Sequence, residues 1–151
     1  MINDSNVPPL SLSNERLAHI VKQLSRDFHQ VLDEKLQPFE VNRGFWPYLR
    51  ELWNEEGLSQ RELSDRVGFS GPTTNAFIGR MKSADLIELI PIKKGKPRSL
   101  VYLTKRGREL RKELEPIAEN VNALAVKDMT KEEIELFKNF LLRAHQNLSS
   151  N

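Results

Sequence analysis

The sequence contains no cysteine, and this absence excludes several kinds of chemistry at once. Disulfide bonds, thiolate zinc sites and redox sensing through cysteine all require a thiol. The histidines, His19, His29 and His145, lie far apart in the chain and lack the close spacing of zinc ligands on one helix. We therefore expect no metal and no cofactor.

Long apolar runs and a signal peptide are also missing. No run of about 18 apolar residues is present, so we expect no membrane span and no membrane partner. Residues 1–11 carry an acid and prolines instead of a basic segment followed by an apolar one. The sequence therefore predicts a cytoplasmic protein with a short loose tail.

Groupings typical of catalysis are scarce. The carboxylate pairs Glu55–Glu56 and Glu132–Glu133 fall at the ends of expected helices, where solvated acidic side chains are ordinary. There is no Ser/His/acid set and no glycine loop suited to binding phosphate. We expect the protein not to be an enzyme.

Charge is present but unevenly distributed. The formal net charge is +2, yet residues 58–112 contain 13 Lys and Arg against 5 Asp and Glu. One explanation is a mosaic of solvated surface charges. The excess coincides with the motif described next, however, and a basic centre between acidic ends is typical of proteins that bind nucleic acids.

Residues 58–84 have the pattern of two short helices joined by a tight turn. Ser59 and Glu62 form a capping box that opens the first helix. The turn contains Ser70 or Gly71 as the cap of the next helix, and Pro72 suits a first helical position. The second helix, from Pro72 to about Ala84, is expected to bury Phe77, Ile78 and Met81. This pattern predicts a helix-turn-helix, whose second helix enters the major groove of DNA.

A two-stranded hairpin follows. The segments 86–90 and 99–103 are rich in β-branched and apolar residues, as strands are. Between them, residues 93–98 place four cations around a glycine and a proline, with no acid. A helix-turn-helix followed by such a hairpin is a winged helix-turn-helix, whose wing contacts the DNA backbone or minor groove.

Long amphipathic helices flank this unit. We expect helices over about 13–36, 43–56 and 105–126, with a kink or break at Pro116 and Gly57 as the cap of the second, and a last helix after a capping box of Thr130 and Glu133. The predicted fold class is mainly α with a small β-hairpin wing. The predicted divisions are a flexible tail (1–12), an N-terminal dimerisation helix (13–40), the winged helix-turn-helix (41–107), C-terminal dimerisation helices (108–148) and a frayed end (149–151).

The apolar stripes of the terminal helices exceed what a small winged core can cover. A homodimer in which both termini pair with those of a second copy would bury them, and would also present two recognition helices to DNA. The alternative is a monomer in which these helices form a closed bundle.

In this order and spacing, several fragments together resemble the MarR family of bacterial transcriptional regulators. The fragments are Gly57–Ser64, Val67–Thr74, Arg80–Met81, Leu86–Ile87 and Val101–Gly107, the last being a strand that ends in Leu-Thr-x-x-Gly. The resemblance implies a homodimer that binds palindromic operators in double-stranded DNA, commonly as a repressor, and is often released by a small aromatic or phenolic ligand. The alternative function is a winged helix that binds protein or RNA.

The chain departs from the family pattern at two places. The family wing usually carries an Asp that braces an Arg; here Arg98 is the nearest candidate for that arginine, and the acid is missing. Asp85 stands where the family usually has Gly at the end of the recognition helix. Asp tolerates a left-handed backbone less well than Gly, so we expect a weaker cap.

The resemblance and the chemistry of the side chains together give a predicted DNA-binding set. Asn75 is the expected reader of adenine, with Thr73 and Ala76 beside it, although an exposed Asn can also be idle. Thr74 either contacts DNA or faces inward, and Arg80 either contacts phosphate or forms an internal salt bridge. The full set is Ser59, Gln60, Ser70, Pro72, Thr73, Thr74, Asn75, Arg80, Lys93, Lys94, Lys96 and Arg98.

The resemblance to the MarR family implies an effector site between the dimerisation helices and the DNA-binding unit. Aromatic rings beside Arg43 would suit an aromatic carboxylate, with the guanidinium pairing to the carboxylate. The alternative is ordinary core packing. The candidate residues are Phe28, His29, Arg43, Phe45, Trp46 and Leu49.

Overall fold

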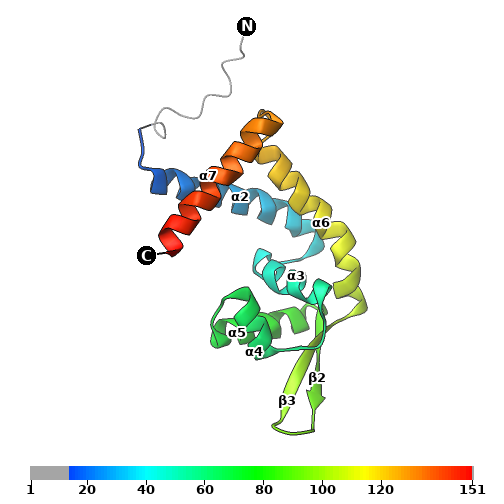
Figure 1. Cartoon of the computed structure of the whole chain (residues 1–151). Helices are drawn as coiled ribbons and strands as arrows, with labels where there is room; N and C mark the ends of the chain where they lie inside the picture. The colour runs from blue at the N-terminus through cyan, green and yellow to red at the C-terminus, as the bar shows by residue number, and fades with distance from the viewer. Residues whose placement is uncertain (1–13, 151) are drawn as a thin grey trace.

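The computed structural model describes residues 14–150, so the predicted tail, Ser13 and Asn151 lie outside the described residues. The elements are α2 (Leu17–Leu36), η2 (Gln37–Phe39), η3 (Arg43–Phe45), α3 (Trp46–Asn54), β1 (Leu58–Ser59), α4 (Gln60–Val67), α5 (Gly71–Ser83), β2 (Ile87–Ile92), β3 (Arg98–Leu103), α6 (Lys105–Ala125) and α7 (Lys131–Ser149). Figure 1 shows a winged helix-turn-helix at one end and the three long helices at the other. The predicted fold class is confirmed.

The helix-turn-helix begins and ends at the signals in the sequence. Ser59 caps α4 and completes the capping box with Glu62, and α4 ends at Gly68, whose φ of 78° is left-handed. Of the two candidate caps for α5, Ser70 is the one that accepts a hydrogen bond from the Thr73 N–H. Pro72 therefore occupies the second helical position and not the first. Its missing N–H still costs nothing at the second position, because the N–H groups of the first turn have no partner within the helix.

The sheet has three strands and not the predicted two, in the order β1-β3-β2. The hairpin register runs from Ile87 opposite Leu103 to Ile92 opposite Arg98. The additional strand, β1, pairs Leu58 with Val101. Two residues are too few to show the alternation by which a strand is recognised in sequence.

Some predicted helix boundaries were wrong. The first helix begins at Leu17 and not at Ser13. The predicted helix over 43–56 is a short 3₁₀ turn followed by α3, which ends at Asn54. Gly57 is left-handed, with φ 78°, but it lies beyond the helix end and leads into β1. No break occurs at Pro116, since α6 runs unbroken through it. The last helix, α7, continues to Ser149, the first residue of the predicted frayed end.

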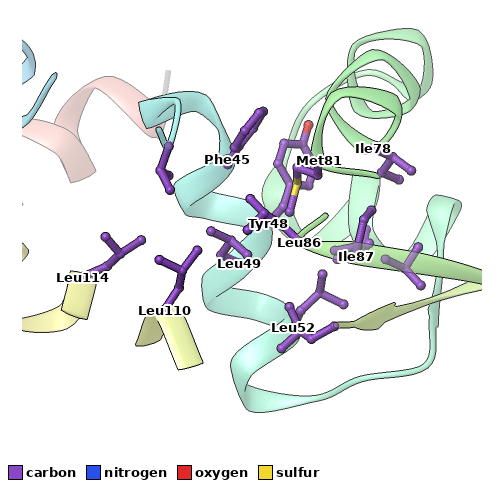
Figure 2. Close-up of a cluster of buried hydrophobic side chains, with 14 of the residues drawn as sticks. Phe45, Tyr48, Leu49, Leu52, Ile78, Met81, Leu86, Ile87, Leu110 and Leu114 are labelled. Carbon is purple, nitrogen blue, oxygen red and sulfur yellow. The ribbon is translucent and has the colours of Figure 1, made fainter. Parts of the chain in front are cut away.

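The core lies where α3 meets α5, the sheet and the first turns of α6, as Figure 2 shows. Tyr48, Leu49, Met81, Leu86 and Leu114 have no solvent-exposed surface. Burying a large apolar side chain contributes about 1.5–3 kcal/mol, so this small cluster supplies much of the driving force for folding the winged unit.

The terminal helices keep apolar surface exposed in a single chain. Of the residues described in α7, none is buried, and Leu136 and Phe140 are 53% and 58% exposed. Leu17 on α2 is 71% exposed. Across residues 14–150, no helix combines the length and apolar character needed to cross a bilayer.

The start of α6 fits closely against the end of α5. Thr104 caps α6, and the backbone N–H of Thr104 donates to the Leu86 carbonyl at 3.0 Å. Gly107 lies so close to this carbonyl that a Cβ atom there would collide with the Leu86 oxygen. Glycine at position 107 is thus required by packing, whereas Gly79 in α5 has open space where its Cβ would be.

Glu56 joins three segments near this junction. Its carboxylate accepts hydrogen bonds from the Leu103 N–H at 2.7 Å and from the Arg108 guanidinium at 2.9 and 3.0 Å. Partial burial acts to raise the pKa of Glu56, but these hydrogen bonds and the charge of Arg108 outweigh it and lower the pKa below its usual value.

Gly107→Ala should destabilise the protein by about 1–3 kcal/mol, because the added methyl must displace the Leu86 carbonyl from its hydrogen bond. Gly79→Ala is the control and should stabilise by about 0.5–1 kcal/mol, because alanine is the better helix former. Urea unfolding of both variants at equal protein concentration measures the difference. Equal stability of the two variants would contradict the packing argument.

Glu56→Gln should reduce the free energy of unfolding near pH 7 by about 1 kcal/mol, a value discounted for solvent screening. The folded-state pKa lies below the unfolded one, so the contribution of Glu56 is full above the usual carboxyl pKa of 4.5. It is lost as the pH falls through the folded-state pKa. Unfolding measured across this range should show the wild type and Glu56→Gln converging in acid, while Glu109→Gln tracks the wild type throughout.

Candidate nucleic-acid interface

The recognition helix α5 presents one polar face to solvent. Thr73, Asn75 and Ala76 are exposed on it, as the sequence predicted. Thr74 is fully buried, and its hydroxyl lies 3.2 Å from the Tyr48 hydroxyl. Including Thr74 in the DNA-binding set was therefore wrong; the inward alternative is correct, because a threonine can enter this apolar layer once its hydroxyl has a partner.

Contacts between aromatic rings attach α5 to the segment 45–48. The ring of Phe77 lies 5.6 Å from that of Tyr48 and 6.2 Å from that of Phe45. The Arg80 guanidinium lies over the Phe77 ring, 5.6 Å from its centre, a cation–π contact that neither prediction for Arg80 included. This support fixes the rotation of α5, and with it the direction of Asn75.

A large hollow of about 660 Å³ lies between the start of α4 and the wing. It brings together predicted residues that are far apart in the sequence. Its lining is Ser59, Gln60, Arg61, Lys94, Gly95, Lys96, Pro97, Arg98 and Ser99. Positive charge from the helix and from the wing therefore converges on one concave surface.

A second hollow of about 370 Å³ continues from the first toward α5. Gln60 and Arg61 line both, and Asn75 lines the second together with Ser64 and Gly71. Arg61 was missed in the predicted set, although its place in the first turn of α4 within the basic segment was a usable signal. Lys93 faces a different hollow on the wing, which it shares with Arg98.

Hydrogen bonds within the caps decide which donors remain for a ligand. The Ser59 hydroxyl and backbone N–H both donate to the Glu62 carboxylate at 2.7 Å, so Ser59 has no spare donor. The Ser70 hydroxyl donates to the Thr73 hydroxyl oxygen, which leaves the Thr73 hydrogen directed elsewhere. Thr73 is accordingly a better donor to DNA than either capping serine.

The helix α4 supplies an acid, Glu62, that interacts electrostatically with the wing arginine Arg98. The hydrogen bonds from Ser59 lower the pKa of Glu62, and the positive charge of Arg98 adds to this effect. The wing itself supplies no acid between positions 93 and 98. The negative charge that interacts with Arg98 therefore comes from the helix-turn-helix and not from the wing.

The six predicted effector residues do not form one site within a single chain. Phe45 and Leu49 are buried in the core. The Trp46 ring packs edge-on against Trp53 at 5.9 Å, and the Arg43 guanidinium pairs with Asp33 at 3.0 Å. Phe28 lies elsewhere, in an apolar groove of about 190 Å³ between α2 and α6, and His29 is exposed. Core packing, the stated alternative, describes most of these residues.

Comparison with known proteins agrees with this architecture. Residues 49–88 match the family described as winged helix-turn-helix DNA-binding, while no curated protein matches the chain in sequence. The chain is similar in structure to the PcaV transcriptional regulator from Streptomyces coelicolor (TM-score 0.83, 20% identity, covering 91% of this chain and 100% of that one). It is also similar to S. aureus MepR in a complex with DNA (0.79, 22%, 91% and 99%).

A MarR transcriptional regulator from Methanosarcina mazei Go1 gives a similar result, with a TM-score of 0.75 and 20% identity over 89% of this chain and 98% of that one. At such identities the likeness concerns the fold. The resemblance to the MarR family seen in the sequence is confirmed at this level: the chain has the winged helix-turn-helix fold of the MarR-type regulators, terminal helices included.

Proposed function

We propose that this protein is a sequence-specific DNA-binding transcriptional regulator, a repressor that binds palindromic operators as a homodimer. The observation that carries the proposal is the continuity of one surface. The exposed face of α5 with Asn75 adjoins the hollow of Gln60 and Arg61, which in turn opens to Lys94 and Lys96 on the wing. A DNA duplex has the matching arrangement, with base edges in the groove and phosphates beside them.

Each side chain then has a role that its chemistry supports. Asn75 reads a base through its carboxamide, and Thr73 donates its free hydroxyl hydrogen to a base or a phosphate. Gln60 and Arg61 contact the backbone phosphates at the edge of the groove. The wing cations Lys93, Lys94, Lys96 and Arg98 neutralise phosphates or enter the minor groove.

The terminal helices supply the dimer in this proposal. The apolar faces of α2 and α7 that stay exposed in one chain are buried against a second copy, and segments 13–40 and 108–148 form the dimerisation region. Two recognition helices about 34 Å apart then meet successive major grooves on one side of the duplex. This geometry requires an operator with two-fold symmetry.

Release by a small aromatic ligand stays a prediction. Of the six residues first assigned to it, Phe28 is the one that lines the apolar groove between α2 and α6. Since that groove adjoins the proposed dimerisation region, a ligand there would act on the spacing of the recognition helices.

Selection from a pool of random duplexes should enrich a motif with two-fold symmetry. Asn75→Ala should lose preference at one position in each half-site, costing about 1–3 kcal/mol there, because the carboxamide no longer pairs with the base. Lys96→Ala is the matched control. It should weaken binding to all sequences alike and reduce the salt slope by about one, as expected of a phosphate contact.

The two variants separate base reading from charge. If Asn75→Ala weakens binding to every sequence equally, its assignment as a base reader is wrong. If the wild type enriches no sequence while binding RNA or protein, the winged helix serves a different partner and the proposal fails.

Phe140→Glu should convert the dimer into a monomer, because a carboxylate would replace an aromatic ring on the apolar face proposed to meet the second copy. Asn139→Glu adds the same charge at the neighbouring exposed, polar position and should leave the dimer intact. Sedimentation equilibrium distinguishes the two states. A wild type that sediments as a monomer would contradict the dimer and favour the closed bundle.

A further inference from the structure

Arg106, near the start of α6, contacts two segments that the sequence separates widely. Its Nη1 donates to the Ala84 carbonyl at 2.6 Å, at the end of the recognition helix α5. Its Nη2 donates to the Phe39 carbonyl at 3.3 Å, in the turn that follows the long helix α2. One guanidinium thereby joins the DNA-facing helix to the end of a terminal helix.

The end of α5 depends on donors from outside the helix. Asp85 has a left-handed φ of 57°, a conformation that costs a non-glycine residue energy. The carbonyls of Ala84, Asp85 and Leu86 all accept hydrogen bonds from the segment 104–106: from Arg106, from the Thr104 hydroxyl at 2.6 Å and from the Thr104 N–H at 3.0 Å. The contacts from α6 therefore hold this strained end in place.

The start of α6 is itself anchored to α3. The Trp53 Nε1–H donates to the Gly107 carbonyl at 2.9 Å, and Arg111 donates to the Trp53 carbonyl at 3.1 Å. Further along, α6 packs beside α2, as Figure 1 shows. A continuous set of contacts thus leads from α2 and α6 to the first turn of α6, where Arg106 bonds to the Ala84 carbonyl at the end of α5.

We propose that Arg106 is a positioning residue that couples the orientation of the recognition helix to the packed pair of long helices α2 and α6, here called the α2–α6 arm. The effect of this coupling on DNA binding rests on the proposed function. In a dimer the α2–α6 arms set the distance between the two recognition helices. Arg106 therefore sets how strictly the protein selects the spacing between half-sites. A planar guanidinium suits this role because its fixed fork reaches two carbonyls in different directions. A lysine ammonium on a flexible stem does not hold both in a fixed geometry.

The coupling can be measured without DNA. The chain has no cysteine, so Lys82→Cys on α5 and Arg26→Cys on α2 place two spin labels at exposed sites. Pulsed electron resonance, with labelled chain diluted in excess unlabelled chain, gives the distribution of the intrachain distance. Arg106→Gln should broaden this distribution. Lys105→Gln removes the same charge at the neighbouring position, where the side chain pairs with Glu109 on its own helix at 3.8 Å, and should leave the distribution narrow.

Further variants separate coupling from stability. Arg106→Lys keeps the charge and should still broaden the distribution. Asp85→Gly in the Arg106→Gln background relieves the left-handed strain and should restore melting temperature while the distribution stays broad. A distribution that stays narrow in Arg106→Gln, or that narrows again with Asp85→Gly, would overturn the proposal, because Arg106 would then act as an ordinary helix cap.

The DNA consequence is tested on the duplex selected by the wild type, with one base pair inserted between or deleted from its half-sites. The penalty for altered spacing should fall roughly five-fold in Arg106→Gln, with affinity for a single half-site unchanged. An unchanged penalty would overturn the role in spacing. If the wild type selects no duplex, the proposed function fails, and the distance measurement still decides whether Arg106 couples the two helices.

Discussion

The structure depends on one short junction, where the carbonyls of residues 84–86 accept hydrogen bonds from residues 104–106. Here the recognition helix ends, the wing closes and α6 begins. Gly107 allows the two backbones to approach, and the ring of Trp53 fixes the same turn to α3. Because the backbone carbonyls at this junction are hydrogen-bonded to neighbouring elements, the recognition helix cannot rotate freely against the wing or the long helices.

The internal hydrogen bonds also determine which polar groups are available to bind a partner. Serines that cap helices have their donors occupied, and the Thr74 hydroxyl is hydrogen-bonded to the Tyr48 hydroxyl inside the core. The groups that remain for a partner include the carboxamides of Gln60 and Asn75, the Thr73 hydroxyl, Arg61 and the wing cations. These groups share one surface because the short strand β1 holds the start of α4 against β3, which leads back to the wing tip. The partner surface is therefore defined as much by which groups are occupied as by which are exposed.

Local signals in the sequence predicted most of the fold. Capping residues such as Ser59 and Thr130 mark helix starts by chemistry that acts within three residues, and both were placed correctly. The strand β1 was missed because it pairs with β3 through a long-range contact, and a strand of two residues is too short to show an alternating pattern in the sequence. The stop at Asn54 was also missed, because the following residues are held by contacts to β3 and α6 and not by a helix cap.

The candidate site was predicted less evenly. The wing cations were predicted from the local excess of positive charge, and Asn75 was predicted from its position on the outward face of the recognition helix. The sequence shows both features directly. Whether Thr74 faced DNA or the core depended on Tyr48, a residue 26 positions away, and sequence alone left both alternatives open. The predicted effector residues are dispersed within one chain, because Arg43 pairs with Asp33 and the Trp46 ring packs against Trp53. Arg106 carried no local signal, since its partners lie in two distant turns.

The most direct test of the account is the affinity of the protein for its selected duplex and for a scrambled duplex of the same composition, at two salt concentrations. The account predicts selective binding to the first, and on both duplexes a steep loss of affinity with salt, because several Lys and Arg side chains displace counterions from phosphates. Equal affinity for the two duplexes would contradict sequence-specific recognition. No binding at low salt would contradict a DNA-binding role altogether.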